Sequence, residues 1–209
     1  MALAHVLYRP EQIQARVAEL AGDITADLAA TGEERPLLIS VLKGSVIFLA
    51  DLVRHMPLDP DVDFMSISRY SADPDSGVVR IVKDLEQALQ GRHVVVVEDI
   101  VDTGLSLSYL LRSLLTRDPA SLRVCTLVNK QVLRIADLPV DYVGFETTEF
   151  LIGYGLDLAG RYRNLPYLAA VPDPAHLAAV GDPAAFFTST SPERRQEAAD
   201  VETRSPGIH

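Results

Sequence analysis

The chain has 209 residues, 48% of them hydrophobic, and is long enough to bury the core of one domain. Its formal net charge of −10 would repel nucleic acids and anionic membranes, so neither is an expected partner. The single cysteine, Cys125, excludes a disulfide framework. We expect a cytosolic protein, because the sequence has no apolar run of about eighteen residues and its N-terminus lacks the pattern of a secretory signal.

The first predicted element is an amphipathic helix between Glu11 and Ala30, preceded by a proline suited to a first helical turn. Its apolar residues recur every three or four positions, at Ile13, Val17, Leu20, Ile24 and Leu28. A buried strand is expected from Leu37 to Leu42, ending in a Lys-Gly turn, and residues 46–56 then show helical periodicity.

Two strand-like segments, residues 62–70 and 78–85, flank a stretch rich in turn residues. We expect them to form a mobile hairpin or flap over about residues 66–82.

The valine run Val94–Val97 predicts a central strand of a parallel sheet that is covered on both faces. We expect this strand to end at Glu98 and Asp99, with a tight loop that leads into a helix. Two further strands are expected at 122–130 and 140–146. Strands and helices that alternate in this way predict an α/β fold with a doubly wound, mostly parallel sheet.

The composition changes at Pro172, after which Ala, Pro, Ser and charged residues dominate. We therefore expect a folded domain over residues 1–171 and a poorly packed C-terminal extension over 172–209.

The loop after the valine strand is the strongest candidate for a ligand site, because ligands of open α/β sheets bind beyond the carboxyl ends of the strands. Backbone N–H groups at a helix start, with the hydroxyls of Thr103 and Ser106, can bind one phosphate. Glu98, Asp99 and Asp102 would repel a polyphosphate but accept hydrogen bonds from sugar hydroxyls, so ribose 5-phosphate fits. The structural alternative is that the carboxylates are solvated and that Thr103 or Ser106 caps the helix.

Several segments together resemble a known family. "VVVVEDIVDTGLSLSYL" is similar to the phosphoribosyl pyrophosphate (PRPP) signature of type I phosphoribosyltransferases. Five further segments resemble the hypoxanthine-guanine branch of that family: "SVLKGSVIFLADL", "VDFMSIS", "SGVVRIVKDL", "VDYVGFE" and "GYGLDLAGRYRNLPY". The resemblance runs from about Leu37 to Val171.

The resemblance implies an open, mostly parallel sheet flanked by helices, with a small hood and a flexible flap. It implies Mg²⁺-dependent transfer of the phosphoribosyl group from PRPP to a 6-oxopurine, hypoxanthine or guanine, which yields IMP or GMP and pyrophosphate. Family members assemble as homodimers or homotetramers.

Residue roles follow from the same resemblance. The PRPP-binding positions are Glu98, Asp99, Asp102, Thr103, Gly104, Leu105 and Ser106. The loop from Asp102 to Ser106 matches the 5′-phosphate site, and Asp102 also matches the general base or acid at purine N7, with helix capping as its structural alternative. Glu98 and Asp99 match the ribose anchors, which act partly through metal or water.

Lys43 and Gly44 match the pyrophosphate-binding loop, in which the family often has a cis peptide before the lysine. Arg163 matches a cation that meets the pyrophosphate, and Asp157 matches a Mg²⁺ ligand. Without the family, Asp157 and Arg163 would be a surface ion pair.

Lys130 matches the lysine that donates to the purine 6-oxygen. Phe150 matches the aromatic residue that stacks on the base, although core packing is its alternative, and the backbone of Leu151 matches the group that contacts the base edge. Arg69 and Tyr70 match the flap.

Most of the differences from the family pattern lie near the purine. Asn129 occupies a position that is usually acidic, the segment after Lys130 has fewer basic residues, and the hood segment Thr147–Phe150 is shortened and lacks the usual Ile-Pro-Asp. In the flap, Arg69 replaces a serine. Preference for another base, such as xanthine, is therefore an alternative.

Two other functions compete with catalysis. One is a nucleotide-sensing regulator of the same fold that binds RNA, against which the acidity and the presence of Lys43, Lys130 and Phe150 argue. The other is a noncatalytic partner subunit that binds PRPP but no purine. The five histidines show no paired metal spacing, which argues against a zinc hydrolase.

Overall fold

The computed structural model describes residues 4–69, 79–130, 134–136 and 138–180. Its elements, in chain order, are β1 (His5–Tyr8), α1 (Pro10–Ala29), β2 (Leu37–Val41), α2 (Val46–His55), β3 (Asp61–Arg69), β4 (Val79–Lys83), β5 (His93–Val101), α3 (Leu105–Leu115), β6 (Ser121–Asn129), β7 (Tyr142–Glu146), β8 (Leu151–Ile152), β9 (Leu168–Ala170) and α4 (Pro174–Val180).

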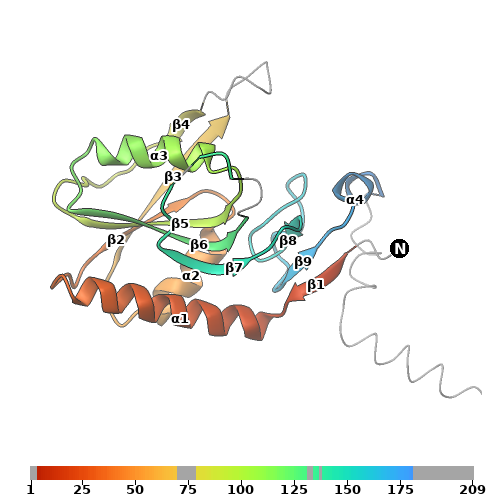
Figure 1. The fold of residues 1–209 in the computed structure, drawn as a ribbon, viewed down its shortest axis with the longest axis horizontal. Helices are drawn as coiled ribbons and strands as arrows, with labels where there is room; N and C mark the ends of the chain where they lie inside the picture. The colour runs from red at the N-terminus through yellow and green to blue at the C-terminus, as the bar shows by residue number, and fades with distance from the viewer. Residues whose placement is uncertain (1–3, 70–78, 131–133, 137, 181–209) are drawn as a thin grey trace, which may run out of the picture.

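The main sheet has six strands in the order β4-β3-β2-β5-β6-β7 (Figure 1). All neighbours in it pair in parallel except β3 and β4. The valine run lies in the interior of this sheet, with Val94 opposite Leu37 of β2 and Leu122 of β6, and all four valines are buried. The predicted central strand and the α/β class are both confirmed.

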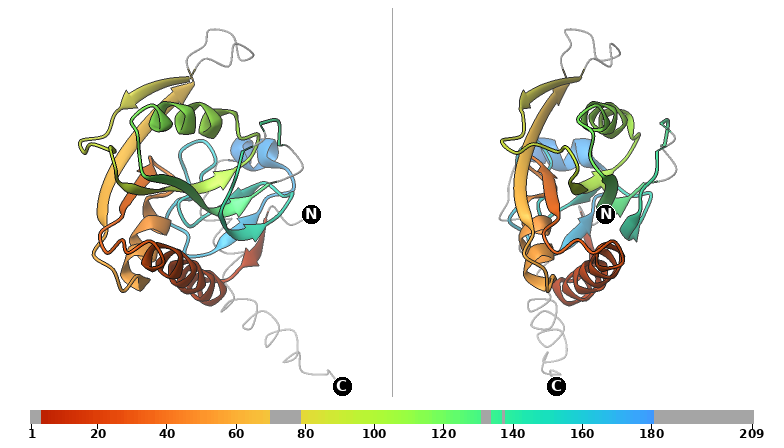
Figure 2. Two further views of the ribbon diagram at one scale, coloured as in Figure 1. Left: turned by 60° about the vertical axis from the view of Figure 1, so that its left-hand side comes forward. Right: turned by 90° about the vertical axis from the view of Figure 1, so that its left-hand side faces the viewer.

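Helices cover both faces of this sheet, as Figure 2 shows from two further directions. Val95 and Val97 pack in a core with the buried faces of α1 and α2, whereas Val94 and Val96 pack in a second core with α3. The five apolar positions predicted for the first helix are all buried in α1. In the part of the chain that the structure describes, no helix is long and apolar enough to cross a membrane.

The central strand continues further than the sequence suggested. We expected β5 to end at Glu98 and Asp99, but it runs to Val101 because β6 continues to pair with it, Val101 lying opposite Asn129. The two carboxylates therefore lie within a strand that is paired on the β6 side, and only residues 102–104 separate it from α3.

A second, three-stranded antiparallel sheet of order β1-β9-β8 forms a hood beside the carboxyl ends of the main strands (Figure 1). Helix α4 belongs to this hood, because Leu177 is buried in a cluster with Ile152 and Ala169. The folded chain thus continues past the boundary expected at Val171, while residues 181–209 lie outside the described ranges.

Strands β3 and β4 pair antiparallel as a hairpin at one edge of the main sheet, with Ser68 opposite Arg80. This is where a flap was expected. Tyr70 and the side chain of Arg69 lie outside the described residues, so the flap itself stays a prediction.

The opposite edge of the main sheet is β7, and three of its carbonyl groups accept hydrogen bonds from side chains. Arg16 of α1 donates to the carbonyls of Val143 (2.7 Å) and Gly144 (3.0 Å). The hydroxyl of Tyr8 donates to the carbonyl of Glu146 at 3.3 Å. These bonds tie the edge strand to α1 and to the hood.

Candidate active site

Three candidate segments follow directly after neighbouring parallel strands. Lys43 and Gly44 follow β2, the loop from Asp102 to Gly104 follows β5, and Lys130 follows β6. Because the order β2-β5-β6 is continuous, the carboxyl ends of these strands meet at one edge of the sheet.

The loop after β5 has the geometry of an anion site. Gly104 begins α3 with φ of 77°, in the left-handed region that favours glycine. Gly104, the N-cap residue, has no side chain to cap this helix, and the Leu105 N–H donates a long hydrogen bond of 3.5 Å to Thr103 Oγ1. The other N–H groups in the first turn of α3 lack intrahelical partners and can bind a phosphate, while the contact with Thr103 gives the capping alternative partial support.

Asp102 takes no part in capping through its Oδ1 atom. Its Oδ1 atom is buried and has no hydrogen-bond partner among the residues that the structure describes. Burial of an acceptor without a partner costs about 1–3 kcal/mol, so such an atom suggests a place where a ligand supplies the missing donor.

The strand carboxylates next to this loop are desolvated. Glu98 is buried, and burial together with the charge of Asp99 raises its pKa well above the ordinary value. Burial raises the pKa of Asp99 to about 6, with a further contribution from Asp157, while the Ile100 N–H and the charge of Arg163 oppose the shift. A ligand that brings positive charge or hydroxyl donors to these carboxylates would stabilise their ionised forms.

The pyrophosphate-loop candidate is held between β5 and the hood. The peptide bond between Leu42 and Lys43 is cis, as the resemblance implies. A Cβ atom on Gly44 would lie 1.4 Å from Asp99 Oδ2, and one on Gly155 would lie 2.0 Å from the Gly44 carbonyl oxygen. Only glycine therefore fits at either position.

Asp157 and Arg163 form an ion pair in which Arg163 Nη2 lies 2.6 Å from Asp157 Oδ1. Arg163 also donates to the carbonyl of Gly155, and Asp157 accepts from the N–H of Gly160. Both charged side chains are about one-third exposed, so they remain accessible to a ligand. The pair is therefore anchored to the hood turn that packs on Gly44.

The carboxylates here fit a magnesium ion that takes most of its ligands from elsewhere. Within the described ranges no group of three or more His, Cys, Asp and Glu side chains could hold a metal. Asp99 and Asp157 are close enough for the charge of Asp157 to raise the pKa of Asp99. One or two carboxylates, with waters and substrate oxygens, are ordinary Mg²⁺ coordination.

The purine candidates meet at the end of β6. Lys130 is buried, and its Nζ lies 5.7 Å from the centre of the Phe150 ring, which is 37% exposed. The exposed ring argues against a purely core role for Phe150. The Lys130 N–H donates to the carbonyl of Val101, which joins this segment to β5. Leu151 is buried and pairs with Ala170 in the hood sheet.

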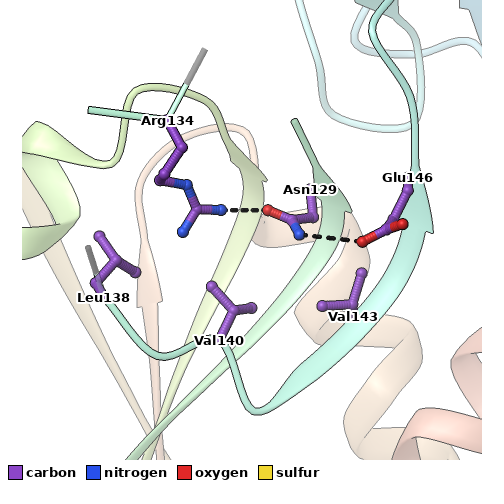
Figure 3. A pocket seen from close by; sticks show the side chains of 6 residues that line it. All are labelled: Asn129, Arg134, Leu138, Val140, Val143 and Glu146. Carbon is purple, nitrogen blue, oxygen red and sulfur yellow. Dashed lines mark hydrogen bonds between the residues drawn. The ribbon is translucent and has the colours of Figure 1, made fainter. Parts of the chain in front are cut away.

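A group of polar residues beside Lys130 was not anticipated. Arg134 donates to the side-chain oxygen of Asn129, whose amide nitrogen lies 3.4 Å from Glu146 Oε1 (Figure 3). With Leu138, Val140 and Val143 they line a cavity of about 370 Å³. Asn129 had been noted only as a departure from the family pattern, and no spacing in the sequence links it to Arg134.

Asp51 and Tyr154 were also missed. Asp51 of α2 accepts hydrogen bonds from Tyr154 and from Gln14. This contact holds the backbone between Gly153 and Gly155, which packs on the pyrophosphate loop, and no sequence pattern connects the two positions.

Comparisons with known proteins agree with this geometry. A family model described as the phosphoribosyl transferase domain matches residues 7–158. The hypoxanthine-guanine phosphoribosyltransferase of Mycobacterium avium is 53% identical over 171 residues, which cover 79% of this chain and 84% of that protein. The hypoxanthine-guanine-xanthine phosphoribosyltransferase of Tritrichomonas foetus is 44% identical over 168 residues, covering 79% and 90%. A crystal structure of a hypoxanthine-guanine phosphoribosyltransferase from Bacillus anthracis matches with a TM-score of 0.75 at 42% identity, covering 79% of this chain and 96% of that one.

Proposed function

This chain belongs to the phosphoribosyltransferase family, and we propose that it salvages purines by transferring the phosphoribosyl group of PRPP to hypoxanthine or guanine, which gives IMP or GMP and pyrophosphate. The observation that carries the proposal is the unpartnered Oδ1 of Asp102. It belongs to a loop with an anion-binding geometry that lies between the candidate purine and pyrophosphate segments.

The loop from Asp102 to Ser106 would bind the 5′-phosphate through the free N–H groups at the start of α3. Glu98 and Asp99, on the preceding strand, would accept hydrogen bonds from the ribose hydroxyls. This assignment places the sugar over β5, where burial already favours a ligand that brings donors to the two carboxylates.

Asp102 is the proposed proton acceptor or donor at purine N7. The purine nitrogen forms a bond to the anomeric carbon while the bond from that carbon to pyrophosphate breaks. A buried carboxylate oxygen without another partner is free to hydrogen-bond to N7 and to move its proton.

On the leaving-group side, Lys43, Gly44 and Arg163 would bind pyrophosphate, and Asp157 would bind Mg²⁺, with Asp99 and Glu98 acting through water. A Mg²⁺ ion bound here would neutralise charge on the pyrophosphate. The loop around Gly44 would bind pyrophosphate through its backbone groups. Its glycine allows this, because it places no side chain between the loop backbone and Asp99.

On the base side, Lys130 would donate to the 6-oxygen of the purine, which favours hypoxanthine and guanine over adenine, whose amino group stands at that position. The partly exposed ring of Phe150 would stack on the base. Xanthine is an alternative base, since the similar protein of Tritrichomonas foetus is named a hypoxanthine-guanine-xanthine phosphoribosyltransferase. Assembly as a homodimer or homotetramer is part of the same proposal.

The test is steady-state formation of nucleoside monophosphate from PRPP and Mg²⁺ with hypoxanthine, guanine, xanthine and adenine. Hypoxanthine or guanine should be turned over, and Asp102→Asn should lower kcat by about 100-fold or more, the typical contribution of a general acid or base. Asp118→Asn is the matched control, because Asp118 is exposed and has the positive φ that asparagine tolerates. Absence of turnover with every oxopurine by folded protein would refute the proposal.

A further inference from the structure

Arg134 contacts the phosphate-loop candidate on one side. Its Cδ atom lies 3.2 Å from the place that a Cβ on Gly104 would occupy, so the side-chain stem runs directly over the start of α3. The two residues after it, Ile135 and Ala136, both donate from their backbone N–H groups to the carbonyl of Thr103, at 2.9 and 3.1 Å. The backbone of this segment therefore fixes the orientation of the loop.

The other end of Arg134 contacts the segment that carries the purine-binding candidate. Its guanidinium donates to the side-chain oxygen of Asn129, the residue before Lys130. Asn129 is only 5% exposed, its amide nitrogen lies near Glu146, and its carbonyl accepts from the N–H of Thr147. The side-chain amide of Asn129 is hydrogen-bonded through both its oxygen and its nitrogen, which fixes its orientation. Together with the backbone bond from Thr147, these contacts hold the end of β6 in place.

The hydrogen bonds of Asn129 with Arg134 and Glu146 lie beside a pocket. Figure 3 shows Arg134, Asn129 and Glu146 in one row across the cavity, with Leu138, Val140 and Val143 to one side of the row. The bond from Arg134 to Asn129 is partly buried, and a hydrogen bond from a charged donor contributes more than one between neutral groups. Arg134 Nε is itself buried without a partner among the described residues.

We propose that Arg134 is a positioning residue that holds the 5′-phosphate loop and Lys130 at the correct separation. The inference rests on the function proposed above, in which the loop and the lysine bind opposite ends of one nucleotide. If their separation changes, the purine nitrogen is no longer aligned with the anomeric carbon, and a misplacement of about 1 Å can slow a reaction by about 100-fold.

This role predicts a kinetic pattern that no single-subsite residue produces. Arg134→Met keeps most of the stem over Gly104 but removes the bond to Asn129. We expect it to raise KM for both PRPP and hypoxanthine and to lower kcat, each by about tenfold, the effect of one lost charged hydrogen bond. Arg134→Lys, which keeps the charge and one donor, should recover most of the loss.

Two further variants complete the experiment. Asn129→Leu should raise KM for hypoxanthine more than KM for PRPP, because Asn129 lies on the Lys130 side of the connection. Arg117→Met is the matched control, since Arg117 also forms a hydrogen-bonded ion pair, with Asp84, away from the site. It should leave all three constants within about twofold, the usual limit for a surface pair.

Active wild-type protein with Arg134→Met constants within about twofold of it, or with only one KM changed, would overturn the inference. Calorimetric titration of each variant with IMP and with PRPP and Mg²⁺ gives a readout independent of turnover, in which Arg134→Met should weaken both ligands. Loss of the proposed function would instead appear as inactive wild-type protein, so the two failures are distinguishable.

Discussion

The proposed phosphoribosyl end and the proposed purine end of the site are supported by different amounts of structure. The phosphate loop extends from β5, which has a paired strand on each side and helices over both faces. Lys130 directly follows β6, which lies next to the edge strand. Phe150 directly precedes the two-residue strand β8 of the hood, and Leu151 is the first residue of that strand. The first end is fixed by the main core, whereas the second depends on a small sheet.

The difference explains where the sequence departs from its family pattern. Asn129 and the shortened segment Thr147–Phe150 both lie at the purine end, where fewer neighbours constrain the backbone. Glu98, Asp99 and Gly104, which resemble the family pattern, lie in or directly after the central strand. We therefore expect base preference to vary more readily than the proposed binding of PRPP.

Gly155→Ala should disrupt the contact between the hood and the loop at Gly44, and we expect it to have the largest effect on catalysis. Its φ of 99° disfavours any side chain, and the new Cβ would lie 2.0 Å from the Gly44 carbonyl oxygen. We expect displacement of the pyrophosphate loop and a loss of kcat/KM of about 100-fold, because catalysis is sensitive to small misplacements. Steady-state kinetics with variable PRPP measures it.

Gly32→Ala is the matched control, since Gly32 lies after α1, away from the site, and has a φ of 78° with no atom within 4 Å of the added Cβ. It should cost only the conformational strain, about 1–2 kcal/mol of stability. Equal kinetic losses in the two variants would show that the contact with Gly44 is unimportant.

Phe150→Leu should affect the purine end alone. Loss of the aromatic face removes stacking on the base, so KM for hypoxanthine should rise by about tenfold while KM for PRPP stays unchanged. The control is Phe145→Leu, which removes a ring stacked on Tyr8 and should lower Tm without changing either KM. A parallel rise in both KM values for Phe150→Leu would contradict the separation of the two ends.

Asp99→Asn should raise the stability of the ligand-free protein, because the ionised Asp99 carboxylate is unfavourable in its buried position. This is the smallest of the three expected effects. Its pKa is about 6 in the folded protein against 3.8 ordinarily, so the folded state binds the extra proton and stability falls as pH rises between these values. At pH 7.5 the ionised carboxylate costs roughly 2 kcal/mol, allowing for its partial exposure. The variant should therefore raise Tm by roughly 5 °C.

The gain should disappear below pH 3.8, where the carboxyl group is protonated in both states. Thermal unfolding of the ligand-free protein at several pH values measures it, with Asp118→Asn as the exposed control. A variant that is no more stable than the wild type at pH 7.5 would show that other groups already compensate the charge of Asp99.

Local patterns were sufficient to predict the main sheet and its helices. The valine run and the spacing of Ile13, Val17 and Leu20 report directly on burial, and both were confirmed. Local patterns could not predict the hood, because β1 is four residues long and pairs with β9, far away in sequence. The end of β5 was misplaced because carboxylates suggested solvent, whereas pairing with β6 decides where a strand ends.

For the candidate site, the sequence identified the residues that lie in the recognisable segments, and the structure brings Asp99, Gly44, Asp157 and Arg163 together. It did not identify Arg134. Arg134 lies in the short described stretch 134–136, outside any helix or strand, and hydrophobic periodicity does not predict its contacts with the loop and with Asn129.

The occupied carbonyls of β7 restrict how copies of this chain can associate. A strand from a second molecule could extend the main sheet there only by displacing Arg16 from Val143 and Gly144 and the Tyr8 hydroxyl from Glu146. Exposed edges are otherwise templates for aggregation, so the first helix and the first strand together protect the folded protein from edge-to-edge growth. An assembly that leaves these hydrogen bonds in place therefore uses surfaces other than the β7 edge.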